Sequence, residues 1–545
     1  MSGPETPESG DGAEVDAATG AEVDTEGEAT ETDAAGSGTG TSRRLHPLTV
    51  PYRVLQQGTS IAILLFVVVP GLSSTVGGGG GLATLGLVVA GVGLFVGYFV
   101  AYYRRFEYEL TADTFDIRSG VLSRREREIP LRRIQNVDIS QNVVQRALGI
   151  AQVGLETAGG GQTEAQLQYV DEGEADRLQS EISRLSRSNG ASGDGEAEPD
   201  SERFETVFSI TPREIGVLGV VSMDFRVASF LFFGASVFAP SAVSAVDDQL
   251  FFGPEGIVGA VLGPLAGLAV VALLALLSGF LNAARYYGFT LDRGGEELRY
   301  ERGLLQRYRG TIPLSKVQSL TIEENVLARA LGYASLTIET AGHTPGSDQS
   351  GGSQSAIPLA ERDRVTSLAR SIESYGIERF QRPPKRARQR YAARYAIALV
   401  SLAAVLSLGT RISDYRLYWY APLAGLLLVP IAAHLKWKHR GYALGDDHVV
   451  TRNGFWVRKF KIVPYHRVQT VFSSETIFQR RRDLGTVTID TAGSQSLVGS
   501  DAQAVDIDSE AVEAIRERVP DELYASLARR RRDGRERNRF SAAEE

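Results

Sequence analysis

The stretch IPLRRIQNVDISQNVVQRALGIAQVGLETAG (Ile129 to Gly159) decides the fold of this chain, because its frame returns twice. The second copy reads IPLSKVQ…RALG…IETAG (Ile312 to Gly342), and the third reads VPYHRVQ…RDLG…IDTAG (Val463 to Gly493). A constant frame in otherwise different sequences indicates one supersecondary unit present three times. The recurring positions, which we interpret as structural, are Pro130, Gln135, Gly149 and Gly159, then Pro313, Gln318, Gly332 and Gly342, and finally Pro464, Gln469, Gly485 and Gly493.

The pattern around each copy predicts a small α+β unit. A glycine ten residues before the proline (Gly120, Gly303 and Gly454) separates two alternating runs, which favours a β-hairpin. The NVVQRALG-type segment then has helical spacing, and the run before TAG returns to strand. In the third copy RDLG lies two residues closer to TAG. An amphipathic helix closes each unit, with apolar residues sharing one face: Leu178, Ile182 and Leu185, then Val365, Leu368 and Ile372, then Val512, Ile515 and Val519. We expect a small antiparallel sheet or barrel covered by this helix.

A pair of apolar segments precedes each copy. Most of the six approach or exceed the roughly 20 residues that a helix needs to cross a bilayer, and their apolar character on all sides sets them apart from amphipathic soluble helices. The predicted spans are Val54 to Ser74, Leu82 to Tyr103, Phe225 to Val243, Gly256 to Leu281, Tyr395 to Thr410 and Leu417 to Leu435. Arginines and lysines flank the spans on the side of the repeated units, so we expect the units and both termini in the cytoplasm.

The amino-acid composition excludes several kinds of chemical site and sets the N-terminal segment apart from the rest of the chain. The chain has 545 residues and no cysteine, which excludes disulfides, thiolate nucleophiles and cysteine metal sites. Its net charge of -8 comes from residues 1–42, which hold eleven Asp or Glu and no Lys or Arg. That segment is too poor in bulky apolar residues to fold alone. Scarce lysine beside abundant arginine and acid resembles proteins of salt-loving archaea.

With these motifs and the preceding helix pairs, the chain resembles the bacterial and archaeal pleckstrin-homology-like domains of the YdbS and YdbT type. The resemblance covers nearly everything from Arg43 to Val519. It implies a multi-domain membrane protein in which transmembrane helical hairpins alternate with α+β PH-like domains, each a small β-barrel or sandwich closed by a C-terminal helix. It also implies a non-catalytic, membrane-tethered role, such as one in envelope stress or toxin tolerance.

The expected boundaries follow from these patterns. They are an acidic tail (1–42), hairpin 1 (43–103), PH-like domain 1 (104–187), a linker (188–203), hairpin 2 (204–284), PH-like domain 2 (285–376), a basic linker (377–394), hairpin 3 (395–435), PH-like domain 3 (436–520) and a basic C-terminal tail (521–545).

Basic residues around the hairpin and the proline are the candidate ligand-binding residues. Beneath an anionic leaflet each cation near the surface would contribute about 1 kcal/mol. The alternative is an ordinary solvated strand face, where exposed ion pairs contribute little. The candidates are Arg124, Arg125, Arg127, Arg132 and Arg133 in the first unit, Arg307, Arg309 and Lys316 in the second, and Arg458, Lys459, Lys461 and Arg467 in the third.

Enzyme signatures are missing from the sequence. The six histidines show no HExxH spacing, and neither a phosphate-binding GxxxxGK[ST] loop nor a GxSxG elbow occurs. We therefore expect no catalytic residues, no cofactor and no metal. Asp224 and Arg226, at the start of the third span, favour an interfacial salt pair over an ion path. The basic segment from Ala528 to Arg539 favours lipid contact or disorder over nucleic-acid binding.

These observations favour a membrane-anchored binding protein. Its expected partners are membrane lipids or a membrane or cytoplasmic protein, and no nucleic acid. The alternative is a transporter or export component whose six helices form a substrate path. Transport needs polar, inward-facing residues in the spans, whereas these spans are nearly featureless.

Overall fold

The computed structural model describes residues 42–58, 80–157, 165–188, 204–223, 256–340, 355–376, 380–412, 419–492 and 501–544. Several expectations lie outside these residues. They are nearly all of the acidic tail, most of the first span (residues 59–74), nearly all of the linker (residues 189–203), the third span with Asp224 and Arg226, and the three glycines of the TAG motifs, Gly159, Gly342 and Gly493.

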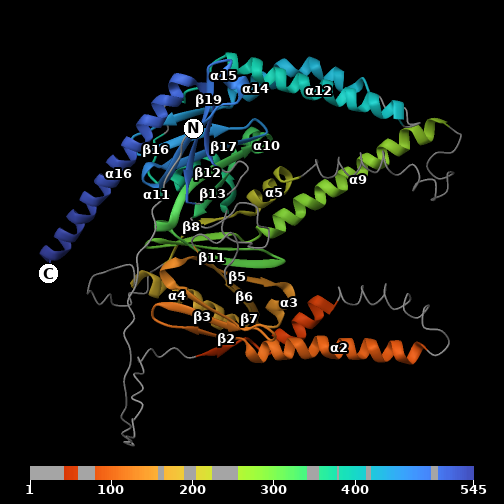
Figure 1. Ribbon diagram of the computed structural model, residues 1–545, viewed down its shortest axis with the longest axis vertical. Helices are drawn as coiled ribbons and strands as arrows, with labels where there is room; N and C mark the ends of the chain where they lie inside the picture. Colours follow the sequence, from red (N-terminus) through yellow and green to blue (C-terminus); the bar gives the residue numbers. More distant parts are fainter. Residues whose placement is uncertain are drawn as a thin grey trace, which may run out of the picture. The chain divides into compact units, whose positions relative to one another are not determined.

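The three copies fold with the same order of elements, as the sequence predicts (Figure 1). The first unit contains β2 (Glu107–Leu110), β3 (Thr114–Ser119), β4 (Arg125–Pro130), β5 (Ile134–Asn142), α3 (Val143–Ala147), β6 (Ile150–Thr157), β7 (Ala165–Asp171) and α4 (Glu172–Ser188). The second contains β9 (Thr290–Gly294), β10 (Glu297–Arg302), β11 (Gln306–Pro313), β12 (Val317–Asn325), α10 (Val326–Leu331), β13 (Tyr333–Thr340), β14 (Ser355–Glu361) and α11 (Arg362–Ile372). The third contains β15 (Gly441–Leu444), β16 (His448–Asn453), β17 (Val457–Pro464), β18 (Val468–Ser474), α15 (Ile477–Arg480), β19 (Leu484–Thr491), β20 (Ala502–Asp508) and α16 (Ser509–Glu544).

Each unit splits its strands between two sheets, and neighbouring units share a sheet. The strand orders are β1-β2-β3-β4, β7-β6-β5-β11-β10-β9-β8, β14-β13-β12-β17-β16-β15 and β18-β19-β20, where β1 is Arg43–Arg44 and β8 is Glu205–Ser209. The second sheet of one unit therefore continues into the first sheet of the next, through the antiparallel pairs β5–β11 and β12–β17. In Figure 1 the orange β5 lies beside the green β11.

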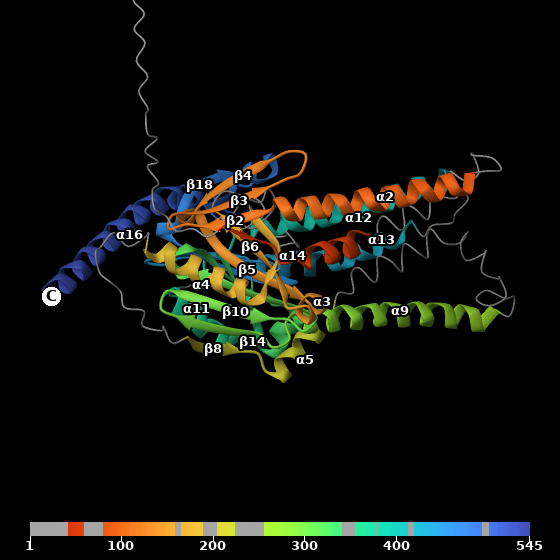
Figure 2. The same ribbon diagram turned by 90° about the horizontal axis from the view of Figure 1, so that it is seen from below.

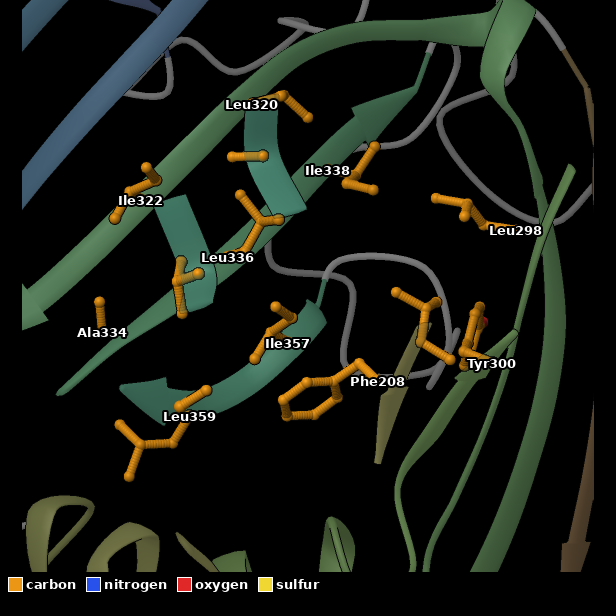
Figure 3. Packing of buried hydrophobic residues seen from close by; sticks show 14 of the residues in the cluster. Phe208, Leu298, Tyr300, Leu320, Ile322, Ala334, Leu336, Ile338, Ile357 and Leu359 are labelled. Carbon is orange, nitrogen blue, oxygen red and sulfur yellow. The ribbon is translucent and has the colours of Figure 1, made fainter. Parts of the chain in front are cut away.

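A separate apolar core lies in each unit, covered by its closing helix. Figure 3 shows part of the second core, where Leu320 and Ile322 of β12 meet Leu336 of β13 and Ile357 of β14. Alternate residues of a strand face the same side, so each strand contributes every second side chain. The helix residues expected to face the core are all buried or partly buried against it. Val450 and Ile462 of the third unit join the second core, because β17 continues its sheet.

The turn glycines of the β3–β4, β10–β11 and β16–β17 hairpins take the conformation that the sequence implies. Gly120, Gly303 and Gly454 have φ of 113°, 111° and 93°, a region that L side chains rarely adopt. A Cβ on Gly303 would also lie 1.8 Å from the carbonyl oxygen of Gln306. Each turn thus requires glycine on two grounds.

The alignment of the third copy at RDLG was wrong. In the first two units the short helix is followed by Gly149 (φ 66°) and Gly332 (φ 79°), and the residue with positive φ that follows the short helix of the third unit is Asp483 (φ 50°), not Gly485. Asp483 stands 19 residues after Pro464, the same separation as Gly149 from Pro130. Gly485 lies inside β19, where a Cβ would approach Val512 Cγ2 to 2.7 Å. No insertion is present, and the motif glycine has been replaced.

Two helices among the described residues meet the length and apolarity of a membrane span, rather than the six expected. They are Leu268–Arg285, within α9 (Gly256–Arg285), and α12 (Arg386–Ile412). The second predicted span is helical throughout as α2 (Gly80–Arg105). The sixth is broken into α13 (Ala421–Ala424), a 3-10 turn and α14 (Val429–Lys438), with a proline near the start of each α-helix.

Two of the predicted boundaries also change. Residues 205–221 were assigned to the second hairpin, but β8 pairs with β9, and α5 (Pro212–Val221) begins with a capping box between Thr211 and Glu214. They belong to the second unit. Residues 521–545 were assigned to a tail, but α16 continues to Glu544. Apolar periodicity had marked only the part of α16 that covers the third core.

Candidate functional site

The tips of the β3–β4, β10–β11 and β16–β17 hairpins each carry two large apolar residues immediately after the turn glycine. These pairs are Val121 and Leu122, then Leu304 and Leu305, then Phe455 and Trp456. Leu122 is 96% exposed and Trp456 is 76% exposed. These side chains lie outside the apolar cores of the three units, so their repeated exposure at the same turn requires a separate explanation.

Each tip contacts the end of the apolar helix that precedes it. Arg105, the last residue of α2, donates from Nη1 to the Val121 carbonyl at 2.9 Å. The Leu304 amide donates to the carbonyl of Ala284 in the last turn of α9, also at 2.9 Å. In the third unit the Phe455 ring lies 5.2 Å from His439, which follows α14. The tips are therefore located where the apolar helices leave the sheets.

The short helices place more apolar residues beside these tips. Val143 and Val144 begin α3, and the equivalent pairs are Val326 and Leu327 in α10 and Ile477 and Phe478 in α15. All six are more than a third exposed. An asparagine or threonine caps each helix, which fixes this pair in the first turn.

Arginines of these helices connect one unit to the tip of the next. Arg146 of α3 donates to the Leu304 carbonyl at 3.0 Å, and Arg329 of α10 donates to the Phe455 carbonyl at 3.3 Å. The Val326 amide donates to the Trp456 carbonyl at 3.0 Å. We call the tips and these helix residues together the apolar rim: Val121, Leu122, Val143, Val144, Leu304, Leu305, Val326, Leu327, Phe455, Trp456, Ile477 and Phe478.

Several predicted basic residues of the second and third units lie in the junctions between units. Arg309 binds Glu172 and Asp176 of α4, at 2.7 and 2.8 Å. Arg458 and Lys459 bind Glu324 and Glu323 of β12. Further along the same pair of strands, Lys461 reaches Glu339 at 2.5 Å, and Arg467 donates to the Ser315 carbonyl. Arg307 instead pairs with Glu301 of its own unit. Carboxylates or carbonyls of the protein therefore contact these cations, and Lys316 stays partly exposed.

The equivalent residues of the first unit are all exposed. Arg124, Arg125 and Arg127 lie along β4 or just before it, and Arg132 and Arg133 lie in the 3-10 turn that follows. No unit precedes this strand, so no preceding carboxylate row covers it. Lipid contact by these five residues stays a prediction.

The first junction also contains a buried polar contact that sequence reasoning missed. Tyr300 donates its hydroxyl to Asp138 Oδ1 at 2.8 Å, and burial followed by the nearby Asp138 charge raises the pKa of Tyr300 well above its usual value. A Cβ on Gly310 would lie 2.4 Å from Asp138 Oδ1. Glycine therefore replaces the arginine or lysine that the other units have at this position. No short motif marks such a contact.

The recurring prolines and glutamines have structural positions. Pro130, Pro313 and Pro464 each precede a 3-10 turn, with φ between -61° and -66°. Gln318 is buried and donates to the Lys316 carbonyl, whereas Gln469 is exposed. The side chain of Gln135 lies outside the described part of the chain. Among the described residues, no group of three or more His, Asp or Glu could hold a metal ion.

Comparison with known proteins identifies the repeated unit. The family model described as Bacterial PH domain matches residues 61–186, 250–376 and 395–527. UPF0699 transmembrane protein YdbT of Bacillus subtilis (strain 168) is 25% identical over 477 residues, covering 84% of this chain and 94% of that protein. No solved structure matches. The likeness to salt-loving archaea has no support from these comparisons. Because each of the three matched stretches contains most of one unit together with apolar residues before it, and because they make up more than half of the sequence, the chain belongs to the Bacterial PH domain family.

Proposed function

We propose that this chain is a non-catalytic, membrane-anchored protein whose three units bind anionic lipid headgroups at the cytoplasmic face of the membrane. The observation that carries the proposal is the apolar rim: in each unit an apolar pair with at least one exposed member lies beside the end of an apolar helix. Such residues are suited to the interface between hydrocarbon and headgroups, where aromatic and cationic side chains gather.

The free energies of apolar burial and of cation attraction support insertion of the rim into the membrane. Full burial of one Leu or Phe side chain contributes about 1.5–3 kcal/mol, and each nearby cation contributes about 1 kcal/mol towards an anionic leaflet. Several tips acting together therefore exceed what one cluster of strand cations would supply. The rim also differs from the junction residues, which are already paired within the protein.

The membrane anchor is supported by the two helices that meet the criteria of a span and by the word transmembrane in the name of the Bacillus relative. Arg104 and Arg105 end α2, Arg285 ends α9 and Lys438 ends α14, on the side of the repeated units. Cations at these ends favour a cytoplasmic position for the units. No charged residue occurs in α9 before Arg285, which favours an anchor over a transport path.

The insertion of a tip is tested with the full chain in nanodiscs that contain brominated phospholipid. We expect the lipid to quench the emission of Trp456, obtained as the difference between the natural protein and Trp456→Phe. An aromatic replacement keeps the apolar tip, so the fold is retained. If this difference emission is the same in brominated and ordinary lipid, the third tip lies in water and the proposal is wrong for that unit.

The headgroup charge is tested with spin-labelled phosphatidylserine and phosphatidylcholine around the reconstituted chain. We expect the double variant Arg146→Gln, Arg329→Gln to lower the preference for phosphatidylserine by up to about 30-fold, from two cations of about 1 kcal/mol each. Arg518→Gln, on the exposed side of α16, is the matched control and should leave the preference unchanged. An equal preference in all three proteins would contradict anionic lipid binding by the rim.

A further inference from the structure

The chain of shared sheets ends in two strand edges that are complementary to each other. β4 is the equivalent of β11 and β17, and β18 is the equivalent of β5 and β12. In the interior of the chain these two kinds of edge pair with each other, as β11 with β5 and β17 with β12. Among the described strands, β4 borders only β3 and β18 borders only β19. Figure 2 shows the β3–β4 hairpin in orange.

The two interior junctions have the same register. Arg307 stands opposite Gln141 in the first, and Arg458 stands opposite Glu324 in the second. Both arginines lie six residues before the motif proline, and both partners lie six residues after the motif glutamine. The neighbouring pairs agree as well, Tyr308 with Ser140 and Lys459 with Glu323. One geometric rule therefore relates each unit to the next.

The same rule applied to the two outer edges places Arg124 opposite Glu475 and Arg125 opposite Ser474. Arg124 and Glu475 are the equivalents of Arg458 and Glu324, which form an ion pair inside the second junction. The closing helix takes part in the first junction as well, where Gln179 of α4 donates a hydrogen bond to Thr311 of β11. At the outer edges, Glu128 of β4 takes the position of Thr311, and Arg516 of α16 takes the position of Gln179. A second pair of opposite charges thus meets. The residue four positions before the motif proline differs among the three units: it is Glu126 in the first, Arg309 in the second and Phe460 in the third.

Burial changes with the presence of a neighbour. Strand β17 pairs with β12 from Leu320 onward, and Leu320, Thr321 and Ile322 are buried there. In β18, Phe472 takes the position of Thr321 and is 46% exposed. Strand β18 contains no charged residue and no proline, which are the usual protections of a free edge. The arginines of β4 do not indicate protection either, because basic residues on the interior edge β17 are found paired.

We propose that the β18 edge binds the β4 edge of a second copy of this chain, in the antiparallel register of the two interior junctions. The contact is heterologous, since two different edges meet, and it repeats along successive copies to give a ring or an open row. The proposed contact is made by the β4 and β18 edges and not by the residues of the apolar rim, so cross-linking of these edges does not depend on lipid binding.

Disulfide trapping tests the register directly, because the natural chain has no cysteine. Arg125→Cys and Ser474→Cys are placed in two differently tagged full-length copies, which are expressed together and oxidised in the native membrane. We expect a mixed dimer, since directly opposed residues in an antiparallel pair lie within disulfide reach. Thr470→Cys replaces Ser474→Cys as the matched control, because it lies four residues, roughly 13 Å, along the same exposed strand. The double variant Glu323→Cys, Lys459→Cys reports the same pair inside one chain and shows that oxidation works.

The outcomes of this experiment show whether a second copy of the chain or a different protein binds the β18 edge. A mixed dimer with Ser474→Cys at least several-fold above that with Thr470→Cys supports the proposal. Equal yields from the two, or none while the internal control is oxidised, overturn it. An adduct of Ser474→Cys with a different protein, and none with the second copy, also overturns it and assigns the β18 edge to that protein.

A charge exchange gives an independent measurement without cysteine. Arg124→Glu in every copy, or Glu475→Arg in every copy, places like charges opposite each other and should lower the fraction of dimers and larger assemblies about threefold. Both residues are exposed, so each variant keeps its fold. The double variant carrying both changes restores opposite charges and should recover the assemblies. Failure of the double variant to recover them, where each single variant loses them, would contradict the predicted register.

Discussion

The strands β4 and β17 occupy equivalent positions in the first and third units, yet their surroundings differ completely. Strand β17 continues the sheet of the second unit, and its Arg458 and Lys461 bind buried or nearly buried carboxylates. Strand β4 has no preceding unit, and residues 122–128 are exposed. The comparison shows that the basic strand β17 of this chain is a joining surface between units. Whether such a strand pairs with another unit of the same chain or remains accessible depends on whether a unit precedes it among the described residues.

The largest expected effect separates the two kinds of edge. Glu324 is 1% exposed and binds Arg458 and Arg362, so Glu324→Ala leaves buried cationic charge without its partner. We expect a loss of about 3 kcal/mol in the free energy of unfolding. Glu475→Ala, at the equivalent exposed position, should change it by less than about 0.5 kcal/mol. Thermal unfolding of the full chain in detergent measures both, and similar losses in the two variants would contradict the distinction.

A second effect compares the 3-10 turns after the two strands. His466 has the position of Arg132, but α16 packs against the third turn, and burial, with Arg530 and Arg467 nearby, lowers the pKa of His466 to about 4. An unfolded histidine titrates near 6.5, so between pH 6.5 and 4 the unfolded chain binds the proton more strongly. Stability due to the neutral ring is therefore lost as the pH falls through this window, by about 2 kcal/mol.

His466→Asn provides the control for this pH dependence. The variant should lose less stability than the natural chain between pH 6.5 and 4.5, measured from the melting temperature at several pH values. Glu373 titrates in a different range: burial raises its pKa, but the hydrogen bond and charge of His448 lower it further, below its usual value. Its contribution is present above about pH 4.5 and is lost only below it. Parallel curves for the two proteins would rule out His466 as the source.

The smallest expected effect concerns the altered motif of the third unit. Gly485→Ala places a Cβ 2.7 Å from Val512 Cγ2 in a packed core and should destabilise the third unit by about 1–2 kcal/mol. Asp483→Gly relieves a positive φ and should stabilise it by up to about 1 kcal/mol. Unfolding of the full chain measures the opposite signs. If Gly485→Ala is neutral and Asp483→Gly destabilises, the structural equivalence of Asp483 with Gly149 is wrong.

Much of the fold was predictable because it depends on local patterns. The turn glycines, the alternating runs of the hairpins and the apolar faces of the closing helices each reflect the geometry of a short segment. The candidate site was less predictable. Their positive charge made Arg309, Arg458 and Lys461 candidates for lipid binding, but they lie in the junctions between units. The sequence signal for the apolar rim was instead a pair of apolar residues after a turn glycine. The exposure of the short helices could not be predicted, because apolar residues such as Val326 and Leu327 are typical of a buried core.

The sequence by itself determined that one unit is present three times, that each unit contains a hairpin, a short helix and a closing helix, and that apolar segments precede each copy. These features arise from backbone preferences and from the period of apolar residues, which act within about 20 residues. Tertiary contacts alone establish that two of the four sheets cross from one unit to the next, that carboxylates of β12 meet cations of β17, and that β4 and β18 are left at the ends. Pairing between strands more than 100 residues apart depends on which edges are available after each unit has folded, and no local pattern records that choice.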